Sequence, residues 1–414
     1  MANTFTTTSR QGFFSRIFNS FLGILLGPVL VIGAIFLLSW NEGRAVQAIV
    51  GLADAAKMVV EVAANAVSPL NEGKLVHVIG PATADAPIID SELNLSFPGQ
   101  VAIARTVEMY QWKEKKEEKT QNNTGGSQTT TTTYTYSKDW SDGSIDSAGF
   151  AHPEGHQNPA MPFSSSRYTA SDARLGGFTL DSETLGLVDL TTPLKPAPPQ
   201  GWSQSSGNLY RSVNPAVPAI GDLRVHYTSL PAGTTISVLA QQSRDGFAAF
   251  TTGNGYQVQL TRLGNAPAGL MIAEKKKAES TLTWILRGVG ALVMFIGFSM
   301  FFAPLSTLAS VIPFLGSLVR GATLAFAFVL TIPITLVTIA IAWLAFRPLI
   351  GGALLTLAAI SLYALWRWHH GRTAVHVAAQ SSAPTAPEGS SAPPATPAAA
   401  HVVAATPPTP PSTH

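Results

Sequence analysis

The sequence HPEGH, which begins at His152, comes nearest to a metal site by residue type. His152 and His156 lie four residues apart, with Glu154 between them. A zinc protease carries His-Glu-x-x-His on a helix, so that both imidazoles face one metal and the glutamate acts as general base. Here the glutamate is at the wrong position, and Pro153 and Gly155 disfavour a helix. We therefore predict that these histidines have a structural role.

No other pattern in the chain points to catalysis. The sequence has no serine nucleophile elbow, no phosphate-binding glycine loop and no Walker lysine, and its carboxylates are scattered. Cysteine is absent from the sequence, which excludes disulfides and thiolate metal sites. The net charge of +2 gives no sign of a nucleic-acid partner. We expect a protein that is not an enzyme, with no catalytic residues, no metal and no cofactor.

A short polar motif occurs twice and is the strongest candidate for a structural or functional motif. The two copies are Asn41, Glu42, Gly43 and Arg44, and Asn71, Glu72, Gly73 and Lys74. Asn and Gly tolerate left-handed backbone, so we expect the first copy to end an apolar run and the second to start a strand. An internal duplication is the alternative explanation. A contact between the two turns would pair Glu72 with Arg44, or Glu42 with Lys74.

The elements that must position these residues are mostly apolar. Hydrophobic residues make up 46% of the chain and charged residues 12%, about half the charged fraction of a soluble domain. A membrane-spanning helix needs about twenty predominantly apolar residues. We predict an integral membrane protein with four transmembrane helices, one N-terminal and three C-terminal, at residues 17–40, 281–303, 321–346 and 348–366. The first is too long for a signal peptide and is expected to be an uncleaved anchor.

Two arginines and one segment stand out in the C-terminal apolar region. Arg287 is the only charge in the second predicted span, where it either extends to the interface or pairs inside the helix bundle. Arg347 lies in the short turn before the fourth span and is expected to be an interfacial cation. Residues 304–320 are apolar but interrupted by Pro313 and Gly316, so we predict an interfacial or re-entrant segment.

Basic residues near the span ends predict the orientation in the membrane. The relevant cations are Arg10, Arg16, Arg320, Arg367 and Arg372. With four spans they all fall on one side, which we predict to be cytoplasmic. This side holds residues 1–16 and an Ala/Pro-rich tail at 373–414, which has little to bury and is expected to be disordered. Residues 41–280 then form an extracytoplasmic domain.

Residues 41–280 are predicted to fold as a large β-rich α+β domain between the first and second spans. Helical periodicity covers residues 45–66, where a polar stripe lies opposite an apolar one. Apolar and polar residues then alternate, as they do from Leu223 to Tyr227, which is typical of half-buried antiparallel strands. Residues 103–140 contain strong turn chemistry between polar arms, which predicts a long projecting hairpin with a mobile tip.

Several segments together resemble the transmembrane protein 43 family, also called the LUMA family. They are NEGRAV, NEGKLVHVIG, RTVEMYQWKE, GHQNP, GDLRV, TWILRGVGALVMFIG and AWLAFRPL, in this order. The Ala/Pro-rich tail and the threonine-rich hairpin tip lie outside the pattern and suggest a divergent, bacterial member. The resemblance implies a membrane protein with a lumenal domain and no enzymatic activity. In animals it implies the endoplasmic reticulum and inner nuclear membrane, with lamins and emerin as partners, which a bacterium lacks.

These features favour a non-enzymatic membrane scaffold. We predict that it organises protein or lipid assemblies through its extracytoplasmic domain and interfacial helices, and that it self-associates. The expected partners are membrane lipids, further copies of the chain and membrane proteins of unknown identity. One alternative is an ion channel or transport component, motivated by Arg287 and by Pro333 in the third span. Another is a lipid-responsive regulator built on residues 304–320 and the helix that follows the first span. The expected location is the inner membrane in a bacterium, or the endoplasmic reticulum and inner nuclear membrane in a eukaryote.

Overall fold

The computed structural model describes residues 3–65 and 67–346, together with the isolated positions 356, 359, 360, 363 and 367. The chain divides into two compact units, Met1–Leu354 and Leu355–His414, and every helix and strand with described bounds belongs to the first. Arg347, most of the predicted fourth span and the predicted disordered tail lie outside the described residues.

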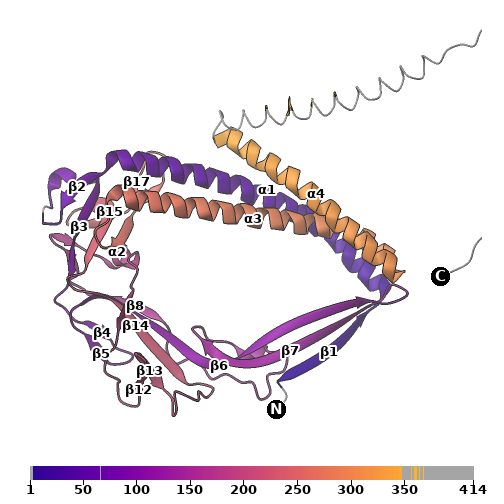
Figure 1. The fold of residues 1–414 in the computed structure, drawn as a ribbon, viewed down its shortest axis with the longest axis horizontal. Helices are drawn as coiled ribbons and strands as arrows, with labels where there is room; N and C mark the ends of the chain where they lie inside the picture. The colour runs from indigo at the N-terminus through magenta and orange to yellow at the C-terminus, as the bar shows by residue number, and fades with distance from the viewer. Residues whose placement is uncertain are drawn as a thin grey trace, which may run out of the picture. The chain divides into compact units, whose positions relative to one another are not determined.

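Three long apolar helices form one part of the first unit (Figure 1). They are α1 (Phe13–Met58), α3 (Ala268–Ala309) and α4 (Pro313–Phe346). Each is long and apolar enough to cross a membrane. The chain is thus a membrane protein with one N-terminal and two C-terminal candidate spans among the described residues, whereas four were predicted.

Helix α1 continues through the first polar motif, so the predicted turn at Asn41–Gly43 is wrong. Asn and Gly cost a helix only about 0.5–1 kcal/mol each, which contacts with other helices outweigh. The helix predicted at residues 45–66 is therefore the C-terminal part of α1, and it stops at Met58. After Met58 the chain forms the strand β2 (Val60–Ala63), which pairs in parallel with residues Val76–Ile79.

Small residues let α1 and α3 approach each other closely. A Cβ atom added to Gly23 would lie 2.4 Å from the carbonyl oxygen of Met300, and one on Gly27 would lie 2.6 Å from that of Gly297. A Cβ on Gly297 would in turn lie 2.8 Å from the carbonyl oxygen of Gly27. These are backbone-to-backbone contacts of the kind that small residues permit between membrane helices.

The segment 304–320 differs from the predicted re-entrant or interfacial segment. Helix α3 continues through Pro304 to Ala309, and α4 begins at Pro313, so only three residues connect two long helices. The proline at the start of α4 fits the first helical turn, where its missing N–H costs nothing. Pro333 lies inside α4, which remains helical on both sides of it.

The rest of the first unit, which we call the β body, consists of strands and short helices between α1 and α3, joined by the N-terminal strand. Its eight-stranded sheet contains β1 (Thr4–Gln11), β6 (Gln100–Asn122), β7 (Gln128–Ser141), β8 (Ser166–Thr169), β11 (Thr192–Leu194), β12 (Ser203–Ser205), β13 (Asn208–Arg211) and β14 (Leu223–Pro231). Its seven-stranded sheet contains β2, β3 (Leu75–Thr83), β9 (Arg174–Leu175), β10 (Phe178–Thr179), β15 (Thr235–Ser243), β16 (Gly246–Ala248) and β19 (Leu260–Leu263). The remaining elements are β4 (Ile88–Asp90), β5 (Leu95–Phe97), α2 (Ser182–Gly186), β17 (Phe250–Thr251), β18 (Gln257–Val258) and the 3-10 turns Pro69–Asn71 and Ser147–Gly149.

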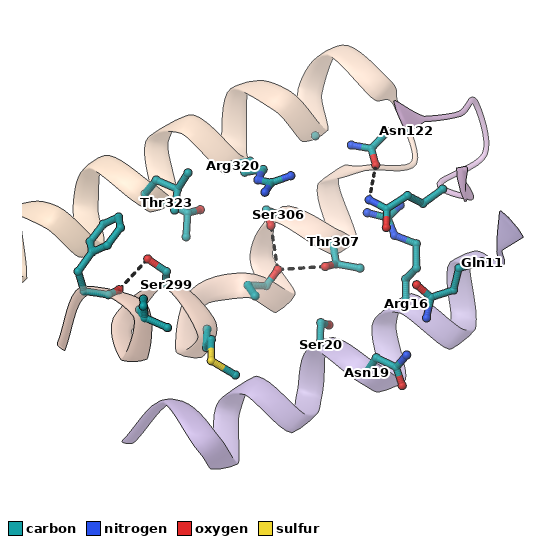
Figure 2. Close-up of a pocket in the computed structure, with 17 residues that line it drawn as sticks. Gln11, Arg16, Asn19, Ser20, Asn122, Ser299, Ser306, Thr307, Arg320 and Thr323 are labelled. Atoms are coloured by element: carbon teal, nitrogen blue, oxygen red, sulfur yellow. Dashed lines mark hydrogen bonds between the residues drawn. The ribbon is translucent and has the colours of Figure 1, made fainter. Parts of the chain in front are cut away.

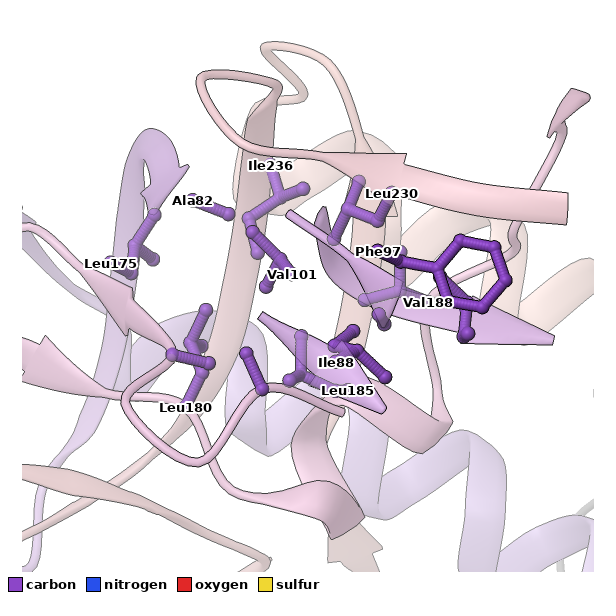
Figure 3. Close-up of a cluster of buried hydrophobic side chains, with 14 of the residues drawn as sticks. Ala82, Ile88, Phe97, Val101, Leu175, Leu180, Leu185, Val188, Leu230 and Ile236 are labelled. Atoms are coloured by element: carbon purple, nitrogen blue, oxygen red, sulfur yellow. The ribbon is translucent and has the colours of Figure 1, made fainter. Parts of the chain in front are cut away.

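A hydrophobic core joins the two sheets of the β body (Figure 3). Val101 of β6 and Ile236 of β15 are both fully buried in it, together with Phe97 of β5. In β14, Leu223, Val225 and Tyr227 are buried while the residues between them are partly exposed. The predicted alternation is therefore confirmed, because each strand has one face toward this core.

The predicted long hairpin is confirmed as β6 and β7, paired from Met109 and Ser141 to Asn122 and Gln128. Its tip is not free, however, because β1 pairs with β7 along eight residues, from Thr4↔Thr135 to Gln11↔Gln128 (Figure 1). Threonine-rich strands favour such pairing. The N–H of Gly125 in the tip also donates to the carbonyl oxygen of Val311, between α3 and α4. This arrangement differs from the predicted one, in which residues 1–16 and the hairpin lie on opposite sides of a membrane.

Candidate functional site

Glu42 is the centre of a polar cluster that joins the three long helices. Its side chain is about 2% exposed, and its carboxylate accepts two hydrogen bonds from Arg287 of α3, from Nε at 2.6 Å and Nη2 at 2.8 Å. The indole Nε1–H of Trp343 in α4 donates to the same carboxylate at 2.5 Å. A bidentate, charge-assisted pair is among the strongest hydrogen-bonding arrangements in proteins. One carboxylate thus connects α1, α3 and α4.

Aromatic rings complete the surroundings of Arg287. Its guanidinium carbon lies 4.7 Å from the ring centre of Trp284 and 5.7 Å from that of Trp343. Both distances are within the range of cation–π attraction. Of the two predictions for Arg287, the structure supports pairing inside the helix bundle rather than extension toward an interface.

A second ion pair ties the same region of α1 and α3 to the β body. Arg44 pairs with Glu279 of α3 and also donates to the hydroxyl of Thr283 at 3.3 Å. Glu279 further accepts from the hydroxyl of Tyr256 at 3.1 Å, and Tyr256 belongs to the loop between β17 and β18. The amide of Asn41 donates to the carbonyl oxygen of Thr283 at 3.2 Å. Asn41, Glu42 and Arg44 therefore all contact α3, which explains why they stay helical.

The second copy of the motif forms the predicted turn before a strand. Asn71 ends a 3-10 turn, Gly73 has a φ of +75°, and β3 starts at Leu75. The carboxylate of Glu72 accepts from the backbone N–H of Arg244 at 2.9 Å. The predicted contacts between the two copies, Glu72 with Arg44 and Glu42 with Lys74, are wrong, because both glutamates have other partners.

The two histidines of the HPEGH sequence lie in an aromatic cluster. The ring of His156 is buried and stacks on Tyr136, with 4.0 Å between ring centres. The ring of His152 stacks on Phe5 of β1 at 4.3 Å. Burial and the neighbouring Glu114 carboxylate raise the pKa of Tyr136 to about 12. Within residues 3–65 and 67–346, no three His, Cys, Asp or Glu side chains form a group that could hold a metal.

Sequence reasoning missed a buried ionic cluster inside the β body. Arg105 of β6 donates to both oxygens of Asp90, at 2.6 and 2.8 Å, and the hydroxyl of Tyr227 donates to the same carboxylate at 2.7 Å. Burial lowers the pKa of Arg105, but hydrogen bonds to Glu92 and Asp90 outweigh this and raise it overall. Asp90, Arg105 and Tyr227 come from β4, β6 and β14, so the cluster fixes these strands together.

No sequence pattern predicts a second feature, a basic pocket at the end of the helix bundle where β1 leads into α1. The pocket has a volume of about 490 Å³ and is lined by the end of β1, by parts of α1, α3 and α4, and by Asn122 of β6 and Gln128 of β7. Figure 2 shows Arg16 of α1 and Arg320 of α4 at this pocket, together with Ser306 and Thr307 of α3. Arg16 donates through Nη1 to the carbonyl oxygen of Gly126 at 2.5 Å and to the hydroxyl of Ser310 at 3.1 Å. Its lining comes from distant segments, which is why no local pattern predicted it.

Comparison with known proteins decides the family. The family model described as Transmembrane protein 43 matches residues 109–348. The chain belongs to the transmembrane protein 43 family. It is 31% identical to Transmembrane protein 43 of Homo sapiens over 358 residues, which cover 83% of this chain and 89% of that protein. It is also 31% identical to the Transmembrane protein 43 homolog of Drosophila melanogaster, over 82% of this chain and 92% of that protein.

No solved structure matches the chain. The resemblance to the transmembrane protein 43 family is thus confirmed over most of the chain. Both the family and the relatives carry a name that refers only to a membrane protein and to no enzymatic domain.

Proposed function

We propose that this member of the transmembrane protein 43 family is a non-enzymatic membrane scaffold, which holds its β body at a membrane and binds partners there. The observation that carries the proposal is how the polar residues of the helices are paired: Glu42 binds both Arg287 and Trp343, and Arg44 and Glu279 join the helices to the β body. The hydrogen bonds and ion pairs of these side chains connect α1, α3, α4 and the β body to one another. A rigid connection between membrane helices and a folded body suits a scaffold.

The sequence motivates a channel or transport function through Arg287 and through Pro333, and α4 remains helical on both sides of Pro333. In the structure the charge of Arg287 is balanced by Glu42 at 2.6 Å, and the arginine side chain is only about 15% exposed. A paired, largely buried cation is poorly suited to attract ions, so we do not extend the proposal to conduction.

The proposal includes location. We propose that the β body lies outside the cytoplasm, in the periplasm of a bacterium or in the lumen of the endoplasmic reticulum or nuclear envelope of a eukaryote. Residues 4–11 pair with β7, and a charged hairpin cannot cross hydrocarbon. Because this pairing would put both ends of α1 beside the β body, we limit the proposed location to the β body and do not carry over the cytoplasmic location predicted for residues 1–16.

The scaffold proposal is tested by cross-linking in native membranes followed by purification in a mild detergent. We expect oligomers of the chain, co-purifying membrane proteins, or both, with the wild type. Glu42→Gln should reduce their recovery, because it weakens the connection between the helices, while the matched change Glu72→Gln in the exposed turn should not. Recovery of the wild type only as a monomer without partners would refute the proposal.

A further inference from the structure

We infer that the groove between α3 and α4 binds one anionic phospholipid, with its phosphate at Arg16 and Arg320 and an acyl chain along the apolar part of the groove. This inference is independent of the scaffold proposal. It rests on two neighbouring cavities that share Phe295 in their linings, one polar and one apolar.

The polar end has the chemistry of an anion site. Arg16 and Arg320 come from different helices, and none of the described residues that line this pocket of about 490 Å³ is acidic. Among the described residues, neither arginine has a carboxylate within 4.0 Å, and the contacts of Arg16 use only Nη1. Its Nε and Nη2 groups remain as donors, beside the amide of Asn122. The nearby hydroxyls of Ser306 and Thr307 donate to the carbonyl oxygen of Ala303. Guanidinium groups bind phosphate through paired donors such as Nε and Nη2.

The apolar end has the chemistry of an acyl-chain site. A second cavity of about 380 Å³ lies between the same two helices, and almost all of its lining is aliphatic or aromatic. The lining residues are Ala291, Leu292, Phe295, Phe328, Thr331, Ile332, Thr335 and Leu336. Phe295 lines both cavities, so the two lie against the same aromatic ring.

The near end of the apolar cavity lies within one leaflet of Arg320. Arg320 and Phe328 are eight residues apart on α4, or about 12 Å along the helix. One leaflet contributes about 15 Å of hydrocarbon, half of a core about 30 Å thick. A phosphate held at Arg320 would therefore allow its acyl chain to reach the apolar cavity beside Phe328.

An intact lipid explains both cavities, whereas inorganic phosphate would occupy only the polar one. Two cations without a lining carboxylate also favour a head group with a net negative charge over a zwitterionic one, as basic pockets between membrane helices do. The inference therefore commits to an anionic phospholipid, and inorganic phosphate is the competing ligand that the experiment must separate from it.

The charge is tested with the full-length protein in detergent, by native mass spectrometry with added phosphatidylglycerol or phosphatidylcholine. We expect one phosphatidylglycerol to bind, and Arg320→Gln to weaken it about tenfold, as the loss of one charge-assisted contact would. The control Lys277→Gln removes an exposed cation at the other end of α3 and should leave binding unchanged. Equal binding of both lipids, or no effect of Arg320→Gln, would overturn the inference.

The acyl-chain site is tested separately, so that the result for the apolar cavity does not depend on the result for the anion site. Ala291→Phe should fill the apolar cavity and weaken phosphatidylglycerol about tenfold, while competition by inorganic phosphate at the polar end stays unchanged. Ala325→Phe makes the same change on α4 outside both linings and should have no effect. If Ala291→Phe retains full lipid binding, or if inorganic phosphate binds as tightly as the lipid, the groove holds no acyl chain and the inference is wrong.

Discussion

The two copies of Asn-Glu-Gly differ in almost every structural respect. The first lies inside α1, and Glu42 is 1% exposed and bound by two other helices. The second lies in an exposed turn, and Glu72 accepts one hydrogen bond from a backbone N–H. The same three residues thus serve either as a helix segment or as a turn, and the partners brought by the rest of the chain decide between them.

The glycines of the two copies are needed for different reasons. Gly73 has a φ of +75°, a conformation that costs other residues about 1–2 kcal/mol. Gly43 is helical, but a Cβ atom there would lie 2.8 Å from the ring of Phe346 in α4. One glycine supplies backbone conformation, and the other supplies space for a neighbouring helix.

The largest difference should appear when each glutamate is removed. Glu42→Ala leaves the guanidinium of Arg287 without its counter-charge in a mostly buried position, which should lower the free energy of unfolding by about 3–5 kcal/mol. Glu72→Ala removes one exposed hydrogen bond and should cost at most about 1 kcal/mol. Thermal unfolding of both variants in the same detergent measures the difference. Equal losses would mean that Glu42 is no more important than a surface residue.

A double replacement tests whether charge at Glu42 is needed at all. Glu42→Leu combined with Arg287→Met removes both charges at similar volume, and such swaps are often nearly neutral because desolvation is avoided. We expect the double variant to recover most of the stability that Glu42→Leu alone loses, a coupling of about 1–3 kcal/mol. If the losses simply add, the two side chains do not interact energetically.

The two glycines should respond differently to a change at Phe346. Gly73→Ala should cost about 1–2 kcal/mol through its backbone alone, whether or not Phe346 is present. Gly43→Ala should be destabilising in the wild type but gain up to about 1 kcal/mol of helix propensity once Phe346→Ala removes the clash. A thermal-unfolding cycle of these variants checks both statements. Rescue of Gly73→Ala by Phe346→Ala would contradict them.

The pairing of β1 with β7 can be tested by a change that should affect stability least. Through this pairing, β1 connects the N-terminal end of α1, which holds the first copy, to the β body, which holds the second. The chain has no cysteine, so Thr7→Cys with Thr132→Cys, which are direct partners, should form a disulfide in membranes. Thr7→Cys with Thr131→Cys is the control, because neighbouring residues of a strand face opposite sides. Absence of the first cross-link would favour the predicted separation of residues 1–16 from the β body.

Local patterns in the sequence predicted local structure well. Alternation from Leu223 to Tyr227 and turn chemistry around Asn123 sufficed for β14 and for the β6–β7 hairpin, since both depend on neighbouring residues. The family resemblance was confirmed over most of the chain.

Contacts between distant segments could not be predicted in this way. Glu42 and Arg287 are separated by 245 residues, and Glu42 and Trp343 by 301. Without those partners, Asn41 and Gly43 look like the end of a helix, and the continuation of α1 to Met58 was missed for that reason. The basic pocket at Arg16 and Arg320 could not be predicted because its lining comes from six separate elements.

The close approach of α1 and α3 limits which part of the bundle can move. Where Gly27 faces Gly297, an added Cβ on either would lie within 3 Å of the other's carbonyl oxygen, so there is no room for a side chain between the two backbones. We therefore expect α1 and α3 to move together. Helix α4 meets α3 through rings, such as Phe295 and Phe328 at 6.4 Å between centres, with two cavities alongside. Any hinge motion in the bundle would fall to α4, which carries both Arg320 and Trp343.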